Sequence, residues 1–182
     1  MDAVNAPLQQ TIAARPMLAK INFPREALVL SGIYQTLFNA GIKLTVLMAA
    51  LLIMGVTPGW GLLLFPLAVL SLILAGTALG LLITPVGLLY TDIGKGLPIL
   101  LQFLMYLTPV VFPMPQAGWA ATLFQLNPLT PLILTARDLL TGFTPEHLSA
   151  FLIVNAAMLL LLSLVWVVYR AAMPILIERM SA

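Results

Sequence analysis

The chain has 182 residues, of which 62% are hydrophobic and only 8% are charged, and its formal net charge is +2. A typical soluble domain carries roughly 25% charged residues, so this composition excludes a soluble globular protein and indicates an integral membrane protein. The absence of cysteine excludes disulfides, thiolate metal sites and cysteine nucleophiles. The eight basic residues are dispersed among apolar runs and form no stripe that would bind nucleic acid.

Apolar runs of membrane-spanning length predict an all-α integral membrane protein. A helix needs about 20 residues to cross a hydrocarbon core of about 30 Å. A polar segment at residues 1–26 precedes a transmembrane domain at 27–170, and a tail follows at 171–182. Within that domain we expect four crossings, at about 27–56, 60–89, 96–112 and 148–169. Turns are expected at Thr57–Gly59 and Thr91–Lys95.

The basic residues predict the orientation of these crossings. Six of them fall on one side if both termini face the cytoplasm, namely Arg15, Lys20, Arg25, Lys95, Arg170 and Arg179. The opposite side then holds only Arg137, and Lys43 lies within a span. Because Lys and Arg are enriched on the cytoplasmic side, this pattern favours a cytoplasmic location for both ends.

The segment at about 117–141 then lies on the outer side. It contains two apolar pieces, 119–126 and 129–140, and each is too short to span the membrane. Paired short helices that enter the membrane and return on the same side, a re-entrant hairpin, fit this pattern. An amphipathic hairpin lying on the outer leaflet is the alternative.

Four polar residues in the first crossing are spaced four apart, which places them on one face of the helix. They are Ser31, Gln35, Asn39 and Lys43. A lysine near the bilayer centre costs about 2.5 to 3.5 kcal/mol on insertion scales, so Lys43 should face protein, water or a partner. The stripe either lines a translocation path or packs on neighbouring helices while Lys43 extends toward the interface.

Two glycines in the second crossing, Gly76 and Gly80, have the spacing of a helix-packing motif, and Thr84 continues the same face. Small residues at this spacing allow another helix to approach closely. We therefore expect this face to pack against a helix rather than to bind a ligand.

Near the predicted outer side, Arg137 and Asp138 are adjacent on a short helix and point about 100° apart, so they do not pair along one face. They either line the outer vestibule of a path or form ion pairs with other segments. His147 is the only histidine, and its polar surroundings favour a solvated loop residue over a catalytic triad. No acid, base, metal or nucleophile constellation predicts an enzyme.

Several strings of residues occur together in a recognisable order. They are Phe23-Pro24-Arg25-Glu26, Tyr90-Thr91-Asp92-Ile93, Thr108-Pro109-Val110, and Asn127-Pro128 followed by Arg137 and Thr141-Gly142. In this order and spacing they resemble the permease subunit of ABC-2 type transporters, particularly the branch that exports O-antigen, capsular polysaccharide or teichoic acid. The resemblance covers nearly the whole chain from about Arg15.

The resemblance implies roles for individual residues. Phe23, Pro24, Arg25 and Glu26, with Tyr90 and Asp92, look like the contact with a separate ATPase subunit. The stretch from Asn127 and Pro128 to Gly142 is similar to the family's re-entrant outer helices at the exit of the path. In that family two permeases and two ATPases assemble, so a permease homodimer is implied. ATP and Mg²⁺ would belong to the ATPase, and no cofactor is expected on this chain.

The family's permeases have six crossings preceded by an amphipathic helix, and this chain resembles a form that starts just before the third crossing. We therefore expect a subunit that lines and gates the path of a polysaccharide or lipid-linked glycan across the cytoplasmic (inner) membrane. The alternatives are a permease for a drug or lipid, and a truncated membrane scaffold without transport activity.

Overall fold

The computed structural model describes residues 1–18, 26–55, 59–110 and 118–181, except for the side chains of Arg15, Leu18, Ala120 and residues 177–181. Parts of several predicted features lie outside the described residues. These are Phe23, Pro24 and Arg25 of the expected ATPase contact, Thr57 and Pro58 of the first turn, residues 111–112 of the expected third crossing, and residue 117 of the expected hairpin.

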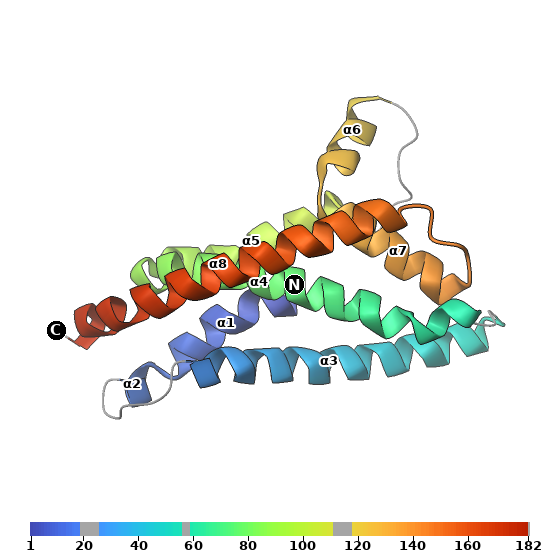
Figure 1. Ribbon diagram of the computed structural model, residues 1–182. Helices are drawn as coiled ribbons and strands as arrows, with labels where there is room; N and C mark the ends of the chain where they lie inside the picture. The colour runs from blue at the N-terminus through green and yellow to red at the C-terminus, as the bar shows by residue number, and fades with distance from the viewer. Residues whose placement is uncertain (19–25, 56–58, 111–117, 182) are drawn as a thin grey trace. The chain divides into compact units, whose positions relative to one another are not determined.

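Within the described residues the chain folds into eight α-helices and one 3-10 helix, with no β-strand (Figure 1). The predicted all-α class is therefore confirmed for this part of the chain. In chain order the elements are α1 (Asp2–Ala13), α2 (Arg15–Leu18), α3 (Glu26–Ile53), η1 (Trp60–Leu63), α4 (Phe65–Leu89), α5 (Thr91–Tyr106), α6 (Trp119–Leu126), α7 (Leu129–Thr141) and α8 (Leu148–Ser181).

Among the described residues, three helices are long and apolar enough to cross a membrane. They are α3 at Glu26–Ile53, α4 at Phe65–Leu89 and the part of α8 at Leu148–Leu176, with 28, 25 and 29 residues. These helices occupy the positions of the first, second and fourth predicted crossings, with boundaries shifted by a few residues. The fourth is longer than expected, because α8 continues beyond Tyr169.

In the region of the expected third crossing at 96–112, the described residues form a helix that is shorter than expected. Helix α5 begins five residues earlier, at Thr91, and ends at Tyr106 after 16 residues. At about 1.5 Å per residue it is about 24 Å long, which is less than the hydrocarbon core. Pro109 explains the end, because a proline disfavours helical geometry in the residue before it, here Thr108.

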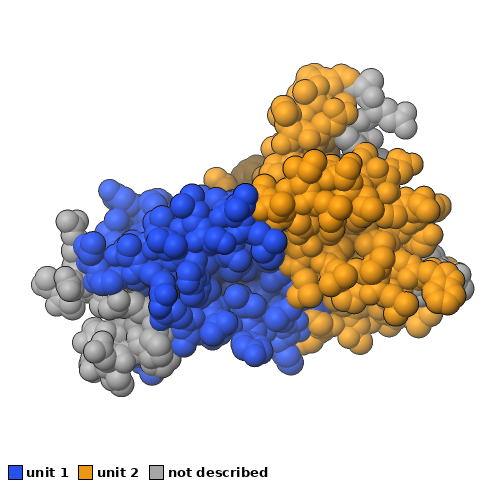
Figure 2. Space-filling model, in the orientation of Figure 1, with its two compact units in different colours: residues 1–40, 73–99, 158–182 blue, residues 41–72, 100–157 orange. Residues whose placement is uncertain are grey.

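The chain divides into two compact units, which Figure 2 shows in different colours. Unit 1 comprises residues 1–40, 73–99 and 158–182, and unit 2 comprises residues 41–72 and 100–157. Both chain ends and the turn at Tyr90 therefore belong to unit 1, whereas the α6–α7 hairpin belongs to unit 2. The long helices α3, α4 and α8 contribute residues to both units.

In unit 1, helix α1 packs against the glycine face of α4. A methyl group on Gly76 would stand 2.6 Å from Cβ of Ala3, and one on Gly80 would overlap the carbonyl oxygen of Val4. Leu8 of α1 is fully buried beside Gly87. The close helix approach predicted from the two glycines is therefore confirmed, and its partner is the segment that the sequence showed only as a polar N-terminal region.

In unit 2, helix α7 packs against η1 and the first turns of α4. Ala136 and Leu139 of α7 form a buried cluster with Phe65 and Ala68 of α4. The approach to η1 is close, because a methyl group on Gly61 would stand 2.6 Å from the carbonyl oxygen of Leu139. Helix α7 is thus an integral part of the unit 2 core.

Helix α7 ends at Thr141, directly before a glycine. Gly142 adopts a left-handed backbone with φ of 81°, and the Phe143 N–H donates to the carbonyl oxygen of Asp138 at 2.9 Å. A glycine in this conformation is the usual residue just past a helix C-terminus, because it has no Cβ to clash. The sequence pair Thr141-Gly142 therefore marks the end of the hairpin.

Candidate functional site

The α6–α7 hairpin, residues 118–142, contains four of the predicted site residues. Helix α6, Trp119–Leu126, has the bounds expected from its apolar piece, and α7, Leu129–Thr141, ends one residue beyond the expected 129–140. Asn127 and Pro128 form the junction between them, and Arg137 and Asp138 lie in the last turns of α7.

Asn127 connects the hairpin to the end of α5. Its Oδ1 accepts the backbone N–H of Leu129 at 3.0 Å, and its Nδ2 donates to the carbonyl oxygen of Leu107 at 3.1 Å. The first bond is a local turn of the kind that asparagine favours at a helix start. The second satisfies a carbonyl just beyond the end of α5, where the last helical carbonyls have no partner within their own helix.

Arg137 makes a second connection to the same segment. Its Nη2 donates to the carbonyl oxygen of Pro109 at 2.6 Å, across 28 residues of sequence. Pro109 is fully buried. A donor with a formal charge makes a stronger hydrogen bond to a carbonyl than a neutral donor does. Together Asn127 and Arg137 form what we call the α5 clamp, two hairpin side chains that hold the carbonyls of Leu107 and Pro109.

Asp138 forms hydrogen bonds through its backbone at the end of α7. Its carbonyl oxygen accepts the N–H of Phe143 at 2.9 Å and the hydroxyl of Thr141 at 3.4 Å. The side chain is half-buried. Asp138 therefore takes part in closing the C-terminus of α7, next to the residue that makes the clamp.

The polar stripe of α3 meets helix α1 over its first half. Ser31 Oγ donates to Oε1 of Gln10 at 3.4 Å, and Gln10 Nε2 donates to Oε1 of Gln35. Asn39, farther along the stripe, is half-buried, and Lys43 is exposed. The structure therefore brings Ser31 and Gln35 together with Gln10. The sequence analysis did not single out Gln10, because a glutamine in a polar segment carries no distinguishing pattern.

The expected ATPase-contact residues that are described lie in unit 1. Tyr90 is 62% exposed between α4 and α5, and Asp92 is exposed in the first turn of α5. An acidic side chain there is favourable because it faces the positive end of the helix dipole. Glu26 begins α3, and its Oε1 accepts a hydrogen bond at 2.9 Å from Nε of Arg170 in α8. The same oxygen lies 2.9 Å from Nη2 of Arg170, so the two side chains form a salt bridge.

Replacing Arg170 by alanine is expected to have a small effect on stability. The two side chains are 64% and 36% exposed, and exposed ion pairs contribute about 0.2 to 1 kcal/mol. The apparent Tm of the purified protein in detergent should fall by less than about 4 °C, and the difference should shrink at high salt. Lys95→Ala, at another exposed base of unit 1, provides the control. A fall that is large and independent of salt would show that Arg170 acts through packing.

Metal coordination finds no support in the described part of the chain. No group of three or more His, Asp or Glu side chains there is arranged to hold a metal ion. The donors concentrated in the α5 clamp and in the contact between α1 and α3 are neutral amides, a hydroxyl and one guanidinium, which suit hydrogen bonding between helices.

Comparison with known families decides the class of the protein. Residues 11–141 match the model of the ABC-2 type transporter membrane family, and this range runs from the end of α1 to the end of α7. The chain belongs to the ABC-2 type transporter family. It is therefore a transporter permease domain and not an enzyme, as the sequence analysis predicted.

One relative of this ABC-2 domain is named for a transport system. The chain is 25% identical over 122 residues to the O-antigen export system permease protein RfbA of Myxococcus xanthus. The aligned part covers 65% of this chain and 47% of the relative. The ABC-2 domain thus spans about half the length of the curated relative that it matches.

Proposed function

We propose that the chain is the permease subunit of an ABC-2 exporter that gives a polysaccharide or lipid-linked glycan a path across the cytoplasmic membrane. The observation that carries the proposal is the family match over residues 11–141. The glycan class is favoured by the similarity to a protein named as an O-antigen export permease.

The topology proposed for this permease has four crossings and both termini in the cytoplasm. Helices α3, α4 and α8 make three of them, and α5 makes the fourth together with the residues that follow it. The α6–α7 hairpin is then a re-entrant element on the outer side. Lys95 and Arg170 belong to unit 1 with the chain ends, and this agrees with the enrichment of basic residues on the cytoplasmic side.

The burial of α7 supports the re-entrant hairpin over one lying on the outer leaflet. Leu132 and Thr135 are fully buried, and Ala136 and Leu139 belong to the unit 2 core. A helix that only rests on a membrane surface would turn its apolar face to lipid rather than to protein.

The proposed path and gate use the residues singled out by the sequence. Asn39 and Lys43 line the path beyond the part of the stripe that α1 occupies, while Ser31 and Gln35 hold α1 in place. Asn127 and Arg137 hold the hairpin to the end of α5, and Pro128 and Asp138 shape its helices. The proposed gate is therefore positioned by the α5 clamp.

Energy for export is proposed to come from a separate ATPase subunit that binds ATP and Mg²⁺, with two permeases in the assembly and no cofactor on this chain. The surface of this chain that contacts the ATPase would comprise Phe23, Pro24, Arg25 and Glu26 with Tyr90 and Asp92. Exposure of Tyr90 and Asp92 supports this assignment, since a docking residue must be accessible.

The decisive experiment is purification from the native membrane in a mild detergent, with identification of the proteins that co-purify. We expect a nucleotide-binding subunit in equal amount, and we expect Tyr90→Ala to reduce its recovery severalfold. Trp60→Ala is the matched control, because Trp60 is an aromatic residue that is 91% exposed and lies in unit 2. Recovery of the permease without any nucleotide-binding subunit would instead favour a membrane scaffold.

A further inference from the structure

A close contact between two glycines in unit 2 brings two exposed aromatic residues to neighbouring backbone positions. A methyl group on Gly59 would stand 2.8 Å from Cα of Gly142. Trp60 directly follows the first glycine and is 91% exposed, and Phe143 directly follows the second and is 71% exposed. Gly59 precedes η1, and Gly142 follows α7. The contact therefore joins the connection between α3 and α4 to the end of the hairpin.

The chain around Trp60 carries no charge. In the sequence no charged residue occurs between Lys43 and Asp92. Ile53 at the end of α3 and Leu63 at the end of η1 are both exposed. An uncharged connection with exposed apolar side chains is unfavourable in water, so a partner that removes this surface from water stabilises it.

The position of this connection indicates which partner that is. Helix α3 ends at Ile53 and α4 begins at Phe65, and both helices are long and apolar enough to cross a membrane. The connection between two helices that cross a bilayer lies at a membrane–water boundary. Tryptophan is enriched at such boundaries, because its ring is apolar while its N–H can donate a hydrogen bond to a polar lipid group.

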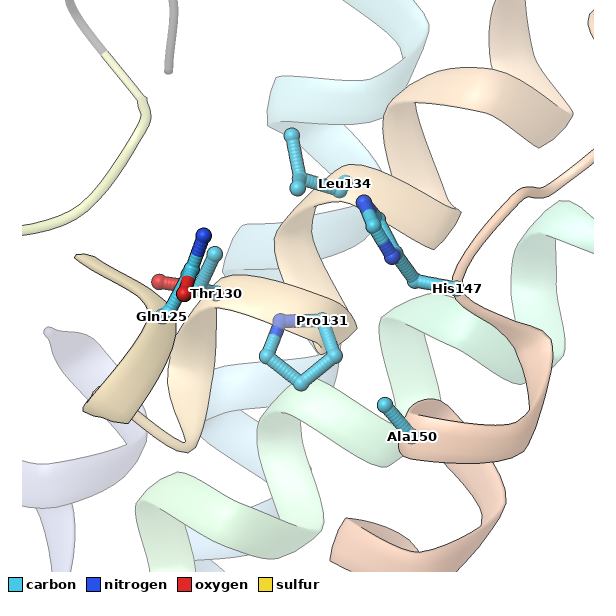
Figure 3. A pocket seen from close by; sticks show the side chains of 6 residues that line it. All are labelled: Gln125, Thr130, Pro131, Leu134, His147 and Ala150. Carbon is cyan, nitrogen blue, oxygen red and sulfur yellow. The ribbon is translucent and has the colours of Figure 1, made fainter. Parts of the chain in front are cut away.

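Neither aromatic residue lines the cavity of unit 2. That cavity has a volume of about 110 Å³ and lies among α6, α7 and the region where α8 begins (Figure 3). Its lining residues are Gln125, Thr130, Pro131, Leu134, His147 and Ala150. Trp60 and Phe143 lie outside it and are exposed. They therefore suit an extended partner, such as a lipid surface, better than a small ligand held in that cavity.

We propose that Trp60 and Phe143 together insert into the headgroup region of the bilayer and anchor the end of α7 at that depth. In the topology proposed above this is the outer surface of the membrane, so the side of the membrane rests on the proposed function, whereas the insertion does not. Because the backbones of Gly59 and Gly142 are in contact, the two side chains enter the same layer. Zwitterionic lipid is a sufficient partner, since neither side chain is charged.

Depth-dependent fluorescence quenching in lipid vesicles tests this insertion. Trp119→Phe combined with Trp166→Phe leaves Trp60 as the only tryptophan. The full chain is reconstituted into phosphatidylcholine vesicles whose acyl chains carry bromine either near the headgroup or near the chain end. Bromine near the headgroup should quench Trp60 about twofold more strongly than bromine near the chain end, because an interfacial indole lies close to the headgroups.

Phe143→Trp reports on the second residue, in a chain whose three native tryptophans are replaced by phenylalanine. It should give the same ratio of shallow to deep quenching as Trp60. Leu160→Trp in that background is the matched control. Leu160 is exposed near the middle of the apolar part of α8, so bromine near the chain end should quench this tryptophan more strongly.

Stronger quenching of Trp60 by deep than by shallow bromine would overturn the proposal. Quenching of Trp60 by neither label, with normal quenching of Leu160→Trp, would also overturn it and would indicate that water or a protein covers this surface. Unequal ratios for Trp60 and Phe143→Trp would overturn the joint insertion. If a nucleotide-binding subunit co-purifies but Trp60 is not quenched, the anchor assignment fails while the exporter assignment stands.

Discussion

Replacing Arg137 by alanine is expected to release the hairpin from the end of α5. The guanidinium donates to the carbonyl oxygen of the buried Pro109, and hydrogen bonds to charged groups contribute about 1.5 to 3 kcal/mol. Loss of the bond should therefore raise the population in which this contact is open by about 10- to 100-fold. In a transporting complex the same variant should abolish most export while leaving membrane insertion intact.

The absence of native cysteine provides a direct measurement of this release. Thr108 is 3% exposed and lies beside Pro109, so Thr108→Cys places a single buried thiol at the clamp. Its rate of reaction with a maleimide in detergent should rise by the same factor when Arg137→Ala is added. Asn127→Ala should act in the same direction with a smaller effect, because a neutral amide donates a weaker bond.

Arg170→Ala is the control for this experiment. It removes the same functional group from an exposed position in unit 1 and should leave the reactivity of the thiol at position 108 unchanged. Arg137→Lys should recover part of the protection, since an ammonium still donates to a carbonyl but lacks the planar fork of arginine. Equal labelling rates with and without Arg137 would show that the clamp does not hold the hairpin.

Gly80→Ala is expected to displace α1 from α4. The added methyl group would overlap the carbonyl oxygen of Val4 and stand 3.1 Å from Cγ of Pro7. A backbone oxygen cannot rotate away as a flexible side chain does, so the helix must shift. Overpacking of this kind costs about 1 to 3 kcal/mol, which corresponds to a fall of about 2 to 12 °C in apparent Tm for a protein of this size. Thermal unfolding followed by tryptophan fluorescence measures it.

Gly96→Ala is the matched control for Gly80→Ala. Gly96 also lies in a helix of unit 1, but a methyl group there meets nothing within 4 Å. Because alanine is a better helix former than glycine, this variant should be as stable as the wild type or more stable. A second readout is Thr11→Cys, a thiol at a fully buried position of α1, which should become reactive only in the Gly80→Ala background. Protection of that thiol in both backgrounds would mean that α1 stays in place.

Local patterns were sufficient to predict most helices. The apolar pieces after Gly118 became α6 and α7 with almost the expected bounds, because Asn127-Pro128 starts a helix and Gly142 ends one by local backbone chemistry. The pattern of apolar residues was a poorer guide to α5. The apolar residues continue past Tyr106, so hydropathy did not indicate that α5 ends there. The helix stops because Pro109 disfavours helical geometry at Thr108.

The sequence by itself determined the membrane class, the family resemblance and the small-residue face of α4. Only the tertiary structure decided which groups these residues contact. Helix α1 packs against Gly76 and Gly80, and backbone carbonyls accept the hydrogen bonds of Asn127 and Arg137. The physical reason is that a motif such as two glycines specifies close approach without naming the partner. A backbone carbonyl acceptor cannot be identified from the sequence either, because every residue carries one. Which carbonyl accepts a given hydrogen bond depends on where the folded chain brings it.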